Sequence, residues 1–164
     1  MEAFIMFFVL ALLLIPYKIE TQLILKAPQH EVMAVLKKFE DYSDWNPFII
    51  AIKGNLKENT CLNVKLKMDQ KIMNISPKVI IIQDNMFCWR GVLGVRYVFD
   101  GMHCFKAEEM PKNGTLFTHT EHFQGLLVWL MFPMLLKTKK HFELMNEALR
   151  QEVEEKIKGE EDGY

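Results

Sequence analysis

The polar residues best suited to chemistry lie in a strand-like run around residue 120. His119 and Glu121 are two positions apart, so in an extended strand their side chains share one face. Phe117 and Phe123 share that face, and the preceding run places His103 among aromatic residues in the same alternation. Imidazoles and a carboxyl on an aromatic wall could orient a ligand, act as an acid–base pair, or bind a metal ion.

Three interpretations of these polar residues stay open. Buried polar groups are normally hydrogen-bonded, so the residues could simply stabilise a cavity wall. Ligand orientation in a pocket is the second interpretation. The third is a metal or acid–base site from His103, His119 and Glu121, and it is the least favoured, because the sequence contains no short metal-binding motif. We therefore predict no metal and no cofactor, and the absence of a GxSxG motif weakens an enzymatic role.

The elements that must position these residues follow from the hydrophobic period. Ile19–Lys26 alternates between apolar and polar residues and predicts a half-buried strand. Residues 27–47 predict one or two short helices. From Leu126 the period is helical again, which predicts one long amphipathic helix to about Lys158, with Pro133 kinking or starting it.

Strand-like runs fill the middle of the chain, and the Asn113-Gly114 pair is typical of a tight hairpin. The runs are Ile49–Gly54, Cys61–Met68, Ile72–Gln83, Met86–Val92, Tyr97–Ala107 and Thr115–Gly125. The expected fold class is α+β, a curved antiparallel sheet of about six to seven strands wrapped around a long C-terminal helix, with an N-terminal apolar helix in addition. Such a sheet encloses a cavity where its inward side chains are too small to fill it.

Several segments of the chain carry a family pattern. The most specific are Trp45–Phe48 (Trp-Asn-Pro-Phe) and Phe99–Phe105 (Phe-Asp-Gly-Met-His-Cys-Phe), with further matches in Gly91–Gly94, Phe117–Leu127 and Phe142–Leu149. In these segments, over about residues 19–155, the chain resembles the SRPBCC superfamily of START and birch-pollen-allergen-like proteins, in particular its polyketide cyclase/dehydrase-like branch. The resemblance implies a helix-grip fold and a hydrophobic pocket, between sheet and helix, that takes lipids, polyketides or sterol-like ligands without a metal.

Strand parity and this resemblance together select the residues that we expect to line the pocket. Trp45 and Asn46 could gate its mouth or plug the core, and Trp129 belongs to the expected start of the long helix. The alternative for Leu126–Leu136 is a membrane-facing patch that takes ligand from the bilayer. The candidate ligand-binding residues are Trp45, Asn46, Phe87, Trp89, Phe99, His103, Phe105, Phe117, His119, Glu121, Phe123, Trp129 and Met145.

The N-terminal segment is the most hydrophobic part of the chain. Residues 1–15 contain 14 hydrophobic residues, and the unbroken run Ala3–Ile15 would span about 20 Å as a helix, short of a bilayer core of about 30 Å. A membrane anchor over residues 3–17 is the leading interpretation, and a cleaved signal peptide or a segment packed on the domain are the alternatives. Lys18 and Lys26 favour a cytoplasmic main domain, with secretion after signal cleavage as the alternative.

The chain therefore divides into an anchor or leader at residues 1–18, a ligand-binding domain at 19–158 and an acidic tail at 159–164. Cys61, Cys88 and Cys104 show no paired spacing and receive no role. A net charge of −1 provides no basic field to hold nucleic acid, so we predict no nucleic-acid partner.

The leading function is binding or transfer of a hydrophobic small molecule or lipid at a membrane. The first alternative is a cofactor-free cyclase- or dehydratase-type enzyme with His119 and Glu121 as acid–base pair. The second is a chaperone-like interaction module without a ligand. The oligomeric state does not follow from the sequence.

Overall fold

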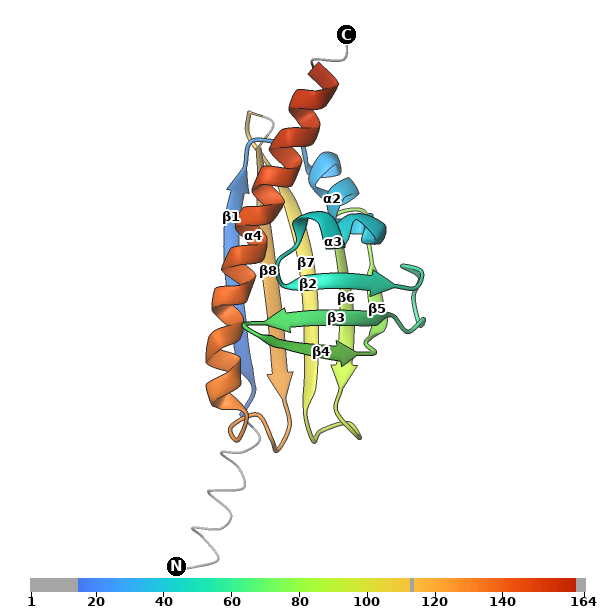
Figure 1. Ribbon diagram of the computed structural model, residues 1–164, viewed down its shortest axis with the longest axis vertical. Coiled ribbons are helices and arrows are strands. Elements are labelled where there is room, and N and C mark those ends of the chain that lie inside the picture. The colour runs from blue at the N-terminus through green and yellow to red at the C-terminus, as the bar shows by residue number, and fades with distance from the viewer. Residues whose placement is uncertain (1–14, 113, 162–164) are drawn as a thin grey trace, which may run out of the picture.

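The computed structural model describes residues 15–112 and 114–161, and its central element is a five-stranded antiparallel sheet (Figure 1). The strand order is β1-β8-β7-β6-β5, so the first strand of the chain pairs with the last. This pairing brings the start of the domain beside the strand that carries His119 and Glu121. The strands are β1 (Tyr17–Leu25), β5 (Lys78–Ile82), β6 (Met86–Val92), β7 (Asp100–Met110) and β8 (Gly114–Gln124).

A second, three-stranded sheet crosses in front of the first (Figure 1). It contains β2 (Ile49–Lys53), β3 (Asn63–Met68) and β4 (Lys71–Ile75). The prediction of one strand over Ile72–Gln83 is wrong, because the chain leaves the small sheet at Ser76 and Pro77 and enters the large one at β5. Proline has no N–H for a strand ladder, which suits this break. The described residues therefore form eight strands in two sheets, where the sequence predicted one curved sheet of six to seven.

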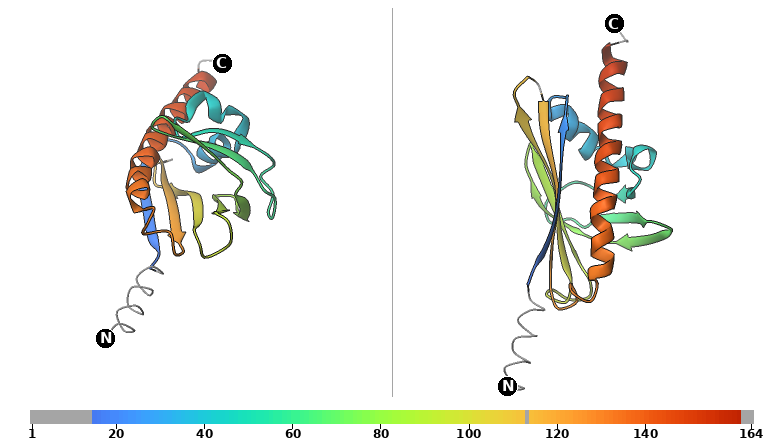
Figure 2. Two further views of the ribbon diagram at one scale, coloured as in Figure 1. Left: turned by 60° about the horizontal axis from the view of Figure 1, so that its bottom comes forward. Right: turned by 90° about the vertical axis from the view of Figure 1, so that its left-hand side faces the viewer.

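One long helix lies along a face of the large sheet, as the edge-on view of Figure 2 shows. Pro133 occupies its first turn, where a missing N–H costs no hydrogen bond, so of the two predicted roles for Pro133, kinking or starting the helix, the structure shows the second. The residues from Leu126 to Met131 form turns and not the first part of the helix, which corrects that prediction. The helices are α2 (Gln29–Lys37), η1 (Phe39–Asp41), α3 (Tyr42–Trp45) and α4 (Phe132–Glu161).

The architecture is the predicted α+β helix-grip fold, a curved antiparallel sheet packed on a long C-terminal helix. Two boundaries of the predicted domains bear on described residues. The helix continues to Glu161, so the acidic tail predicted at 159–164 begins inside it, and residues 162–164 lie outside the described residues. Most of the predicted N-terminal helix and anchor also lies outside them, and Tyr17 already belongs to β1. Within residues 15–112 and 114–161, no helix has the length and apolar character needed to cross a membrane.

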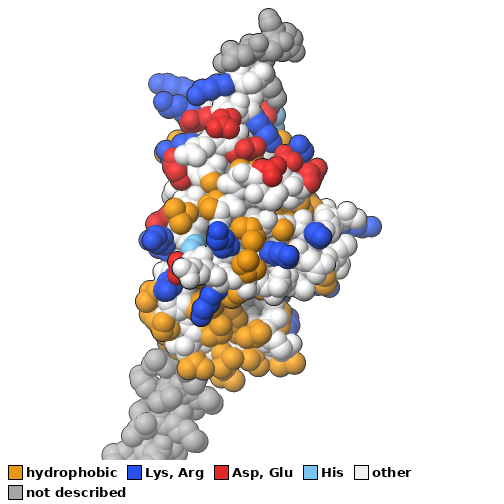
Figure 3. Space-filling model, viewed as in Figure 1, with side chains coloured by type: hydrophobic (Ala, Val, Ile, Leu, Met, Phe, Trp, Pro, Cys, Tyr) orange, Lys and Arg blue, Asp and Glu red, His pale blue; other side chains and the backbone are white. Residues whose placement is uncertain are grey.

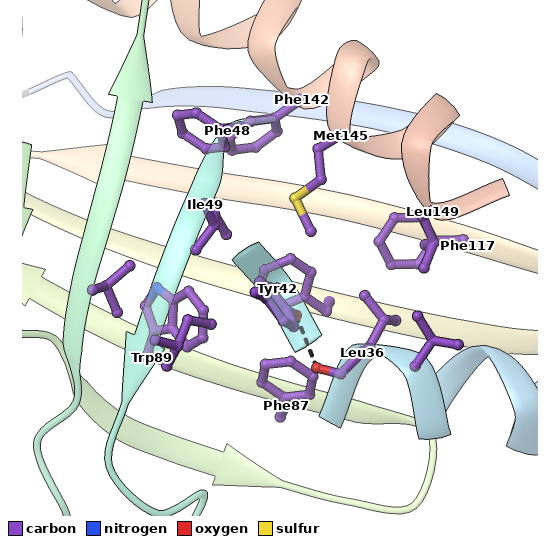
Figure 4. Packing of buried hydrophobic residues seen from close by; sticks show 14 of the residues in the cluster. Leu36, Tyr42, Phe48, Ile49, Phe87, Trp89, Phe117, Phe142, Met145 and Leu149 are labelled. Atoms are coloured by element: carbon purple, nitrogen blue, oxygen red, sulfur yellow. Dashed lines mark hydrogen bonds between the residues drawn. The ribbon is translucent and has the colours of Figure 1, made fainter. Parts of the chain in front are cut away.

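The core fills the half of the interior where α2, α3 and the middle of α4 face the sheet (Figure 4). Phe87 and Phe117 from the sheet, Tyr42 from α3 and Met145 from α4 are all completely buried there. The Tyr42 hydroxyl donates a 2.8 Å hydrogen bond to the Leu36 carbonyl, which satisfies the polar atom of this core residue. Large rings from both layers thus close this half of the interior.

Cys88 and Cys104 form a disulfide between β6 and β7, which corrects the prediction that the cysteines have no role. The two residues face each other directly in the antiparallel register. Sequence spacing could not show this, because the pairing depends on which residues of the two strands lie opposite each other. Cys61 is free and exposed.

The disulfide predicts that only Cys61 reacts when thiols are trapped with a maleimide in intact cells and the unreduced chain is then isolated. After reduction all three cysteines should react, and the free energy of unfolding should fall by about 3 kcal/mol, because a cross-link over a loop of this size restricts the unfolded chain. Intact-mass spectrometry counts the adducts, and Cys61→Ser, with no adduct before reduction, is the control. Three adducts on the unreduced wild-type chain would contradict the disulfide.

Candidate ligand-binding site

A cavity of about 310 Å³ lies between the large sheet, the small sheet and the start of α4. The large sheet and its β6–β7 loop contribute one wall, β3 and β4 the opposite wall, and the first turns of α4 the side between them. Among the lining residues are Gly91, Val92, Leu93, Phe99, Gly101, Glu121 and Phe123 from the first wall, Leu66, Met68, Met73, Asn74 and Ile75 with the adjoining Ser76 from the second, and Met134, Leu135 and Thr138 with the preceding Met131 from the third.

The cavity reaches the surface at the end of the molecule where β1 begins. Val92 and Leu93 line it and are 42% and 53% exposed. Asn74 on β4 and Ser76 just after β4 line it from the other side and are exposed as well. The register pairs Tyr17 with the lining residue Phe123, so the first residues of β1 lie at this same end. A ligand can therefore enter between β4 and the β6–β7 loop.

Three of the predicted site residues, Phe99, Glu121 and Phe123, line the cavity. Strand parity placed Glu121 and Phe123 on the inward face correctly, because side chains alternate along β8. Glu121 and Phe123 lie near the mouth end of β8, and Phe99 lies in the loop just before β7.

Five predicted residues, Phe87, Trp89, Phe105, Phe117 and Met145, lie in the filled core and not in the cavity wall. All of them face inward as predicted, and each is 2% exposed or less. The rings of Phe87 and Phe105 have centroids 4.8 Å apart, and that of Trp89 lies 5.2 Å from Phe105. These side chains are large enough to fill the space under α2 and α3, so no cavity remains at that end.

Trp45 and Asn46, predicted either to gate the mouth or to plug the core, also lie outside the cavity lining. The Asn46 side-chain oxygen accepts hydrogen bonds of 3.0 and 2.8 Å from the backbone N–H groups of Phe48 and Ile49, so Asn46 shapes the turn into β2. Trp45 packs against the ring of Tyr42, with centroids 4.9 Å apart. Trp129 belongs to the turns before α4, where its ring lies 5.3 Å from that of Phe132.

Methionines form much of the wall that the sequence did not identify. Met68 and Met73 come from the small sheet, Met131 from the turn before α4 and Met134 from the first turn of α4. The chain contains 11 methionines, and an unbranched, polarisable side chain suits a cavity that adapts to its contents. The high methionine count is the sequence feature that could have indicated such a wall, but it does not show which methionines lie together.

His103 and His119 form a buried hydrogen-bonded pair that continues into α4 and β1. His119 Nδ1 lies 3.1 Å from Asn146 Oδ1, and Asn146 Nδ2 donates a 2.9 Å hydrogen bond to Thr21 Oγ1. Because Asn146 Oδ1 can only accept, His119 carries its proton on Nδ1, and its Nε2 accepts a hydrogen bond from His103 Nε2–H. Both ring nitrogens of His119 are therefore occupied within the protein.

Burial keeps both histidines uncharged. It lowers the pKa of His119 to about 3, although the hydrogen bond with Asn146 acts in the opposite direction. Burial also lowers the pKa of His103 well below its ordinary value, and the neighbouring His119 lowers it further. Neither histidine lines the cavity. The pair therefore has the geometry of a satisfied polar network in the filled core.

Glu121 is the ionisable residue that lines the cavity. It lies opposite His103 in the strand register, yet no described residue donates a hydrogen bond to its carboxyl or forms an ion pair with it. Burial raises the pKa of Glu121 to about 8, so its carboxyl is mostly protonated at neutral pH. Among the described residues, no group of three histidine, cysteine or carboxylate side chains is placed to hold a metal ion.

No family model and no curated protein matches the sequence. The Zhui aromatase/cyclase from Streptomyces sp. R1128 matches with a TM-score of 0.72 at 12% identity, over 87% of this chain and 96% of that one. A norcoclaurine synthase from Thalictrum flavum matches at 0.70 and 14%, over 88% and 98%. A START superfamily protein from Mycobacterium smegmatis matches at 0.67 and 16%, over 84% and 97%. At these identities the similarity establishes the fold, the helix-grip fold of SRPBCC proteins.

The two buried histidines and the partly buried Glu121 predict that the free energy of unfolding is highest near pH 6.5. Below that pH the unfolded histidines bind protons that folded His103 and His119 do not bind, because burial lowers the pKa of both, so stability falls as pH falls. Glu121 acts in the opposite sense, since its pKa rises from 4.5 to about 8 on folding and stability is lost as pH rises between these values. Below pH 6.5 the loss of stability from the two histidines is larger than the gain from the one carboxyl, so the free energy of unfolding decreases as pH falls.

Glu121→Gln tests this balance. The variant should lose the decrease in stability above pH 6.5, which amounts to about 1.4 kcal/mol per pH unit for one proton, and its decrease toward pH 5 should become steeper. Urea unfolding at pH 5, 6.5 and 8 gives the three free energies. Glu109→Gln, at the exposed end of β7, is the matched control and should follow the wild-type curve. A wild-type stability that does not change between pH 5 and 8 would show that these groups do not titrate as described.

Proposed function

We propose that this helix-grip protein binds and transfers a hydrophobic small molecule or lipid in the cavity between sheet and α4, and that it does so at a membrane. The observation that carries the proposal is the cavity of about 310 Å³, whose walls are apolar except for a few polar side chains. Ligand sites in proteins commonly combine such walls with a small number of placed polar groups. The fold shared with an aromatase/cyclase, a norcoclaurine synthase and a START superfamily protein supports a ligand-binding role.

Exposed hydrophobic side chains around the cavity mouth support contact with a membrane. We call residues 93–99, between β6 and β7, and 125–131, between β8 and α4, the mouth loops. Hydrophobic side chains gather at this end of the molecule, whereas acidic side chains are concentrated toward the other end (Figure 3). An apolar surface patch of this kind commonly marks an interaction site. Its exposed members in the mouth loops are Leu93, Val95, Tyr97, Leu126 and Leu130.

The apolar N-terminal sequence supports the same orientation. The ring of Tyr17, at the start of β1, lies 5.2 Å from that of Phe132, at the start of α4, so the chain enters the domain beside the mouth loops. A membrane anchor over the part of residues 3–17 that precedes β1 would hold the mouth toward the bilayer, and Arg96 in the first mouth loop would meet lipid headgroups. A hydrophobic ligand could then pass between bilayer and cavity without crossing water.

The disulfide supports one side of the membrane over the other. Disulfides persist in oxidising compartments, so the Cys88–Cys104 bond favours an exported domain over the cytoplasmic domain that Lys18 and Lys26 suggest. The thiol trapping in cells described above tests this placement, since reaction of Cys88 and Cys104 before reduction would favour the cytoplasm.

An enzymatic role is the second candidate, favoured by the raised pKa of the Glu121 carboxyl on the cavity wall. The acid–base pair of His119 and Glu121 has less support, because both nitrogens of His119 are already hydrogen-bonded and His119 does not line the cavity. A chaperone-like module without a ligand has less support again, because its interior would be filled. A carrier returns its ligand unchanged, whereas an enzyme converts it.

Filling the cavity should abolish ligand binding. Leu66, partly buried on β3, lines the cavity, and Leu66→Trp would place an indole in it. Native mass spectrometry of detergent-extracted protein should detect a bound hydrophobic molecule on the wild type and at least about tenfold less on the variant. Ile24→Trp, at an exposed position of β1, is the matched control and should retain the ligand. Absence of any bound molecule from the wild type, or equal retention by Leu66→Trp, would argue against the proposal.

Membrane contact at the mouth should be visible in tryptophan fluorescence. In the full chain reconstituted into vesicles, brominated lipids should quench Trp129, which lies in the second mouth loop, whereas Trp89 and Trp45 lie in or beside the filled core. Trp129→Phe should therefore remove most of the quenching. Trp45→Phe should leave it largely unchanged and is the control. If the quenching survives Trp129→Phe, the mouth loops do not face the bilayer.

A further inference from the structure

The Glu121 carboxyl has no partner within the protein, although it lies in an otherwise largely apolar cavity. Among the described lining residues it is the only ionisable side chain, and burial is the cause of its raised pKa. Glu121 is partly buried. Withdrawing a polar group from water without a hydrogen bond costs stability, and such groups in proteins are normally paired. An unpaired carboxyl on the wall of a ligand cavity is a group that the ligand itself can pair.

Gly101 makes room for this carboxyl. A Cβ atom at Gly101 would lie 2.6 Å from Glu121 Oε1, closer than van der Waals contact allows. Gly101 is not among the residues with positive φ, so its backbone conformation does not require glycine. The absence of a side chain leaves space for the Glu121 carboxyl. The carboxyl thus occupies a position on the cavity wall that requires glycine on the neighbouring strand.

The remaining lining residues narrow the chemistry of the ligand. The other polar side chains in the described lining are Asn74, Ser76 and Thr138, and no lysine, arginine or histidine is present there. A ligand carboxylate or phosphate would therefore face Glu121 without a balancing cation, which is unfavourable at low dielectric. A ligand ammonium group at the same position would donate a charge-assisted hydrogen bond to the Glu121 carboxylate.

We propose that the ligand is a basic amphiphile whose hydrophobic body fills the cavity and whose ammonium group pairs with the Glu121 carboxylate. This inference rests on the proposed function, because it assigns the chemistry of the same cavity. It restricts the ligand to molecules with a basic nitrogen and disfavours free fatty acids and lipid phosphates.

Binding of such a ligand should release a proton. At pH 7 the unpaired Glu121 is mostly protonated, and the ligand arrives as an ammonium ion. The ion pair requires a carboxylate, so the carboxyl O–H bond breaks, its electron pair stays on the carboxylate, and one proton leaves to the solvent. At pH 9 the carboxyl is already ionised and no proton is released.

The other titratable groups around Glu121 do not interfere with this count. His103 across on β7 and His119 on β8 are both held uncharged by burial, which lowers the pKa of each. His141 on α4 stacks on Phe48 and lies 3.6 Å from the Asp69 carboxylate, beyond the cavity lining. Proton release at pH 7 is therefore assigned to Glu121.

The test uses octylamine, 1-octanol and octanoate, which share one chain and differ in the polar end. Isothermal titration calorimetry of the full chain in an amphipol should give a dissociation constant for octylamine about tenfold lower than for octanol, with octanoate the weakest. Titrations at pH 7 in phosphate and in Tris should show release of about one proton with octylamine and none with octanol.

Two variants connect the preference to the carboxyl. Glu121→Gln should bind octanol within about twofold of the wild type but lose both the tenfold preference for octylamine and the proton release. Gly101→Ala should have the same effect, because its Cβ would displace the carboxyl. Glu109→Gln and Gly159→Ala, both exposed and outside the cavity, are the matched controls and should keep the preference.

The outcomes separate this inference from the proposed function. If octylamine and octanol bind equally, or octanoate binds best, the inference is wrong and the ligand-binding function stands. If octylamine is preferred equally by the wild type and Glu121→Gln, the nitrogen does not pair with Glu121 and the inference is also wrong. If none of the three binds to the wild type, the proposed function fails as well.

Discussion

The inward face of β7 and β8 must be covered along both eleven-residue strands, and different elements cover its two ends. At one end α2, α3 and the middle of α4 lie over large aromatic side chains, which pack closely, as protein interiors do. At the other end the small sheet and the first turns of α4 form the cover, and β7 contributes Gly101, which has no side chain to fill the space. The filled core and the cavity are therefore two parts of one interface.

Burial shifts the pKa values of the three inward ionisable groups on these strands, and in each case it favours the uncharged form. It lowers the pKa of His103 and His119 and raises the pKa of Glu121, so all three are mainly uncharged near pH 6.5. The two histidines are hydrogen-bonded to each other, and His119 also forms a hydrogen bond with Asn146. Glu121 has no comparable partner and lies at the cavity, which makes it the group available for recognition.

The pairing of β1 with β8 couples the cavity mouth to the beginning of the chain. It places Tyr17 beside Phe123, and the contact of Tyr17 with Phe132 brings the start of α4 to the same end. The mouth loops are part of this end, so Tyr17 and the exposed apolar side chains of these loops lie on one side of the domain. The proposed contact with a bilayer depends on this arrangement.

Local patterns in the sequence determined the element types, the long C-terminal helix and the face on which each side chain of β8 lies, because these depend on periods of two or 3.6 residues along one element. The alternation along β8 showed that His119 and Glu121 share one face of the strand. It did not show that His119 lies in the filled core and Glu121 at the cavity. Those surroundings depend on contacts between residues distant in sequence, such as Asn146 with Thr21 and the small sheet with the start of α4. Strand pairing likewise decides two further features. Ile72–Gln83 is divided between two sheets, and Cys88 lies opposite Cys104. Only the tertiary structure decided which half of the inward face is filled, because the space left over a strand is set by the elements that cover it.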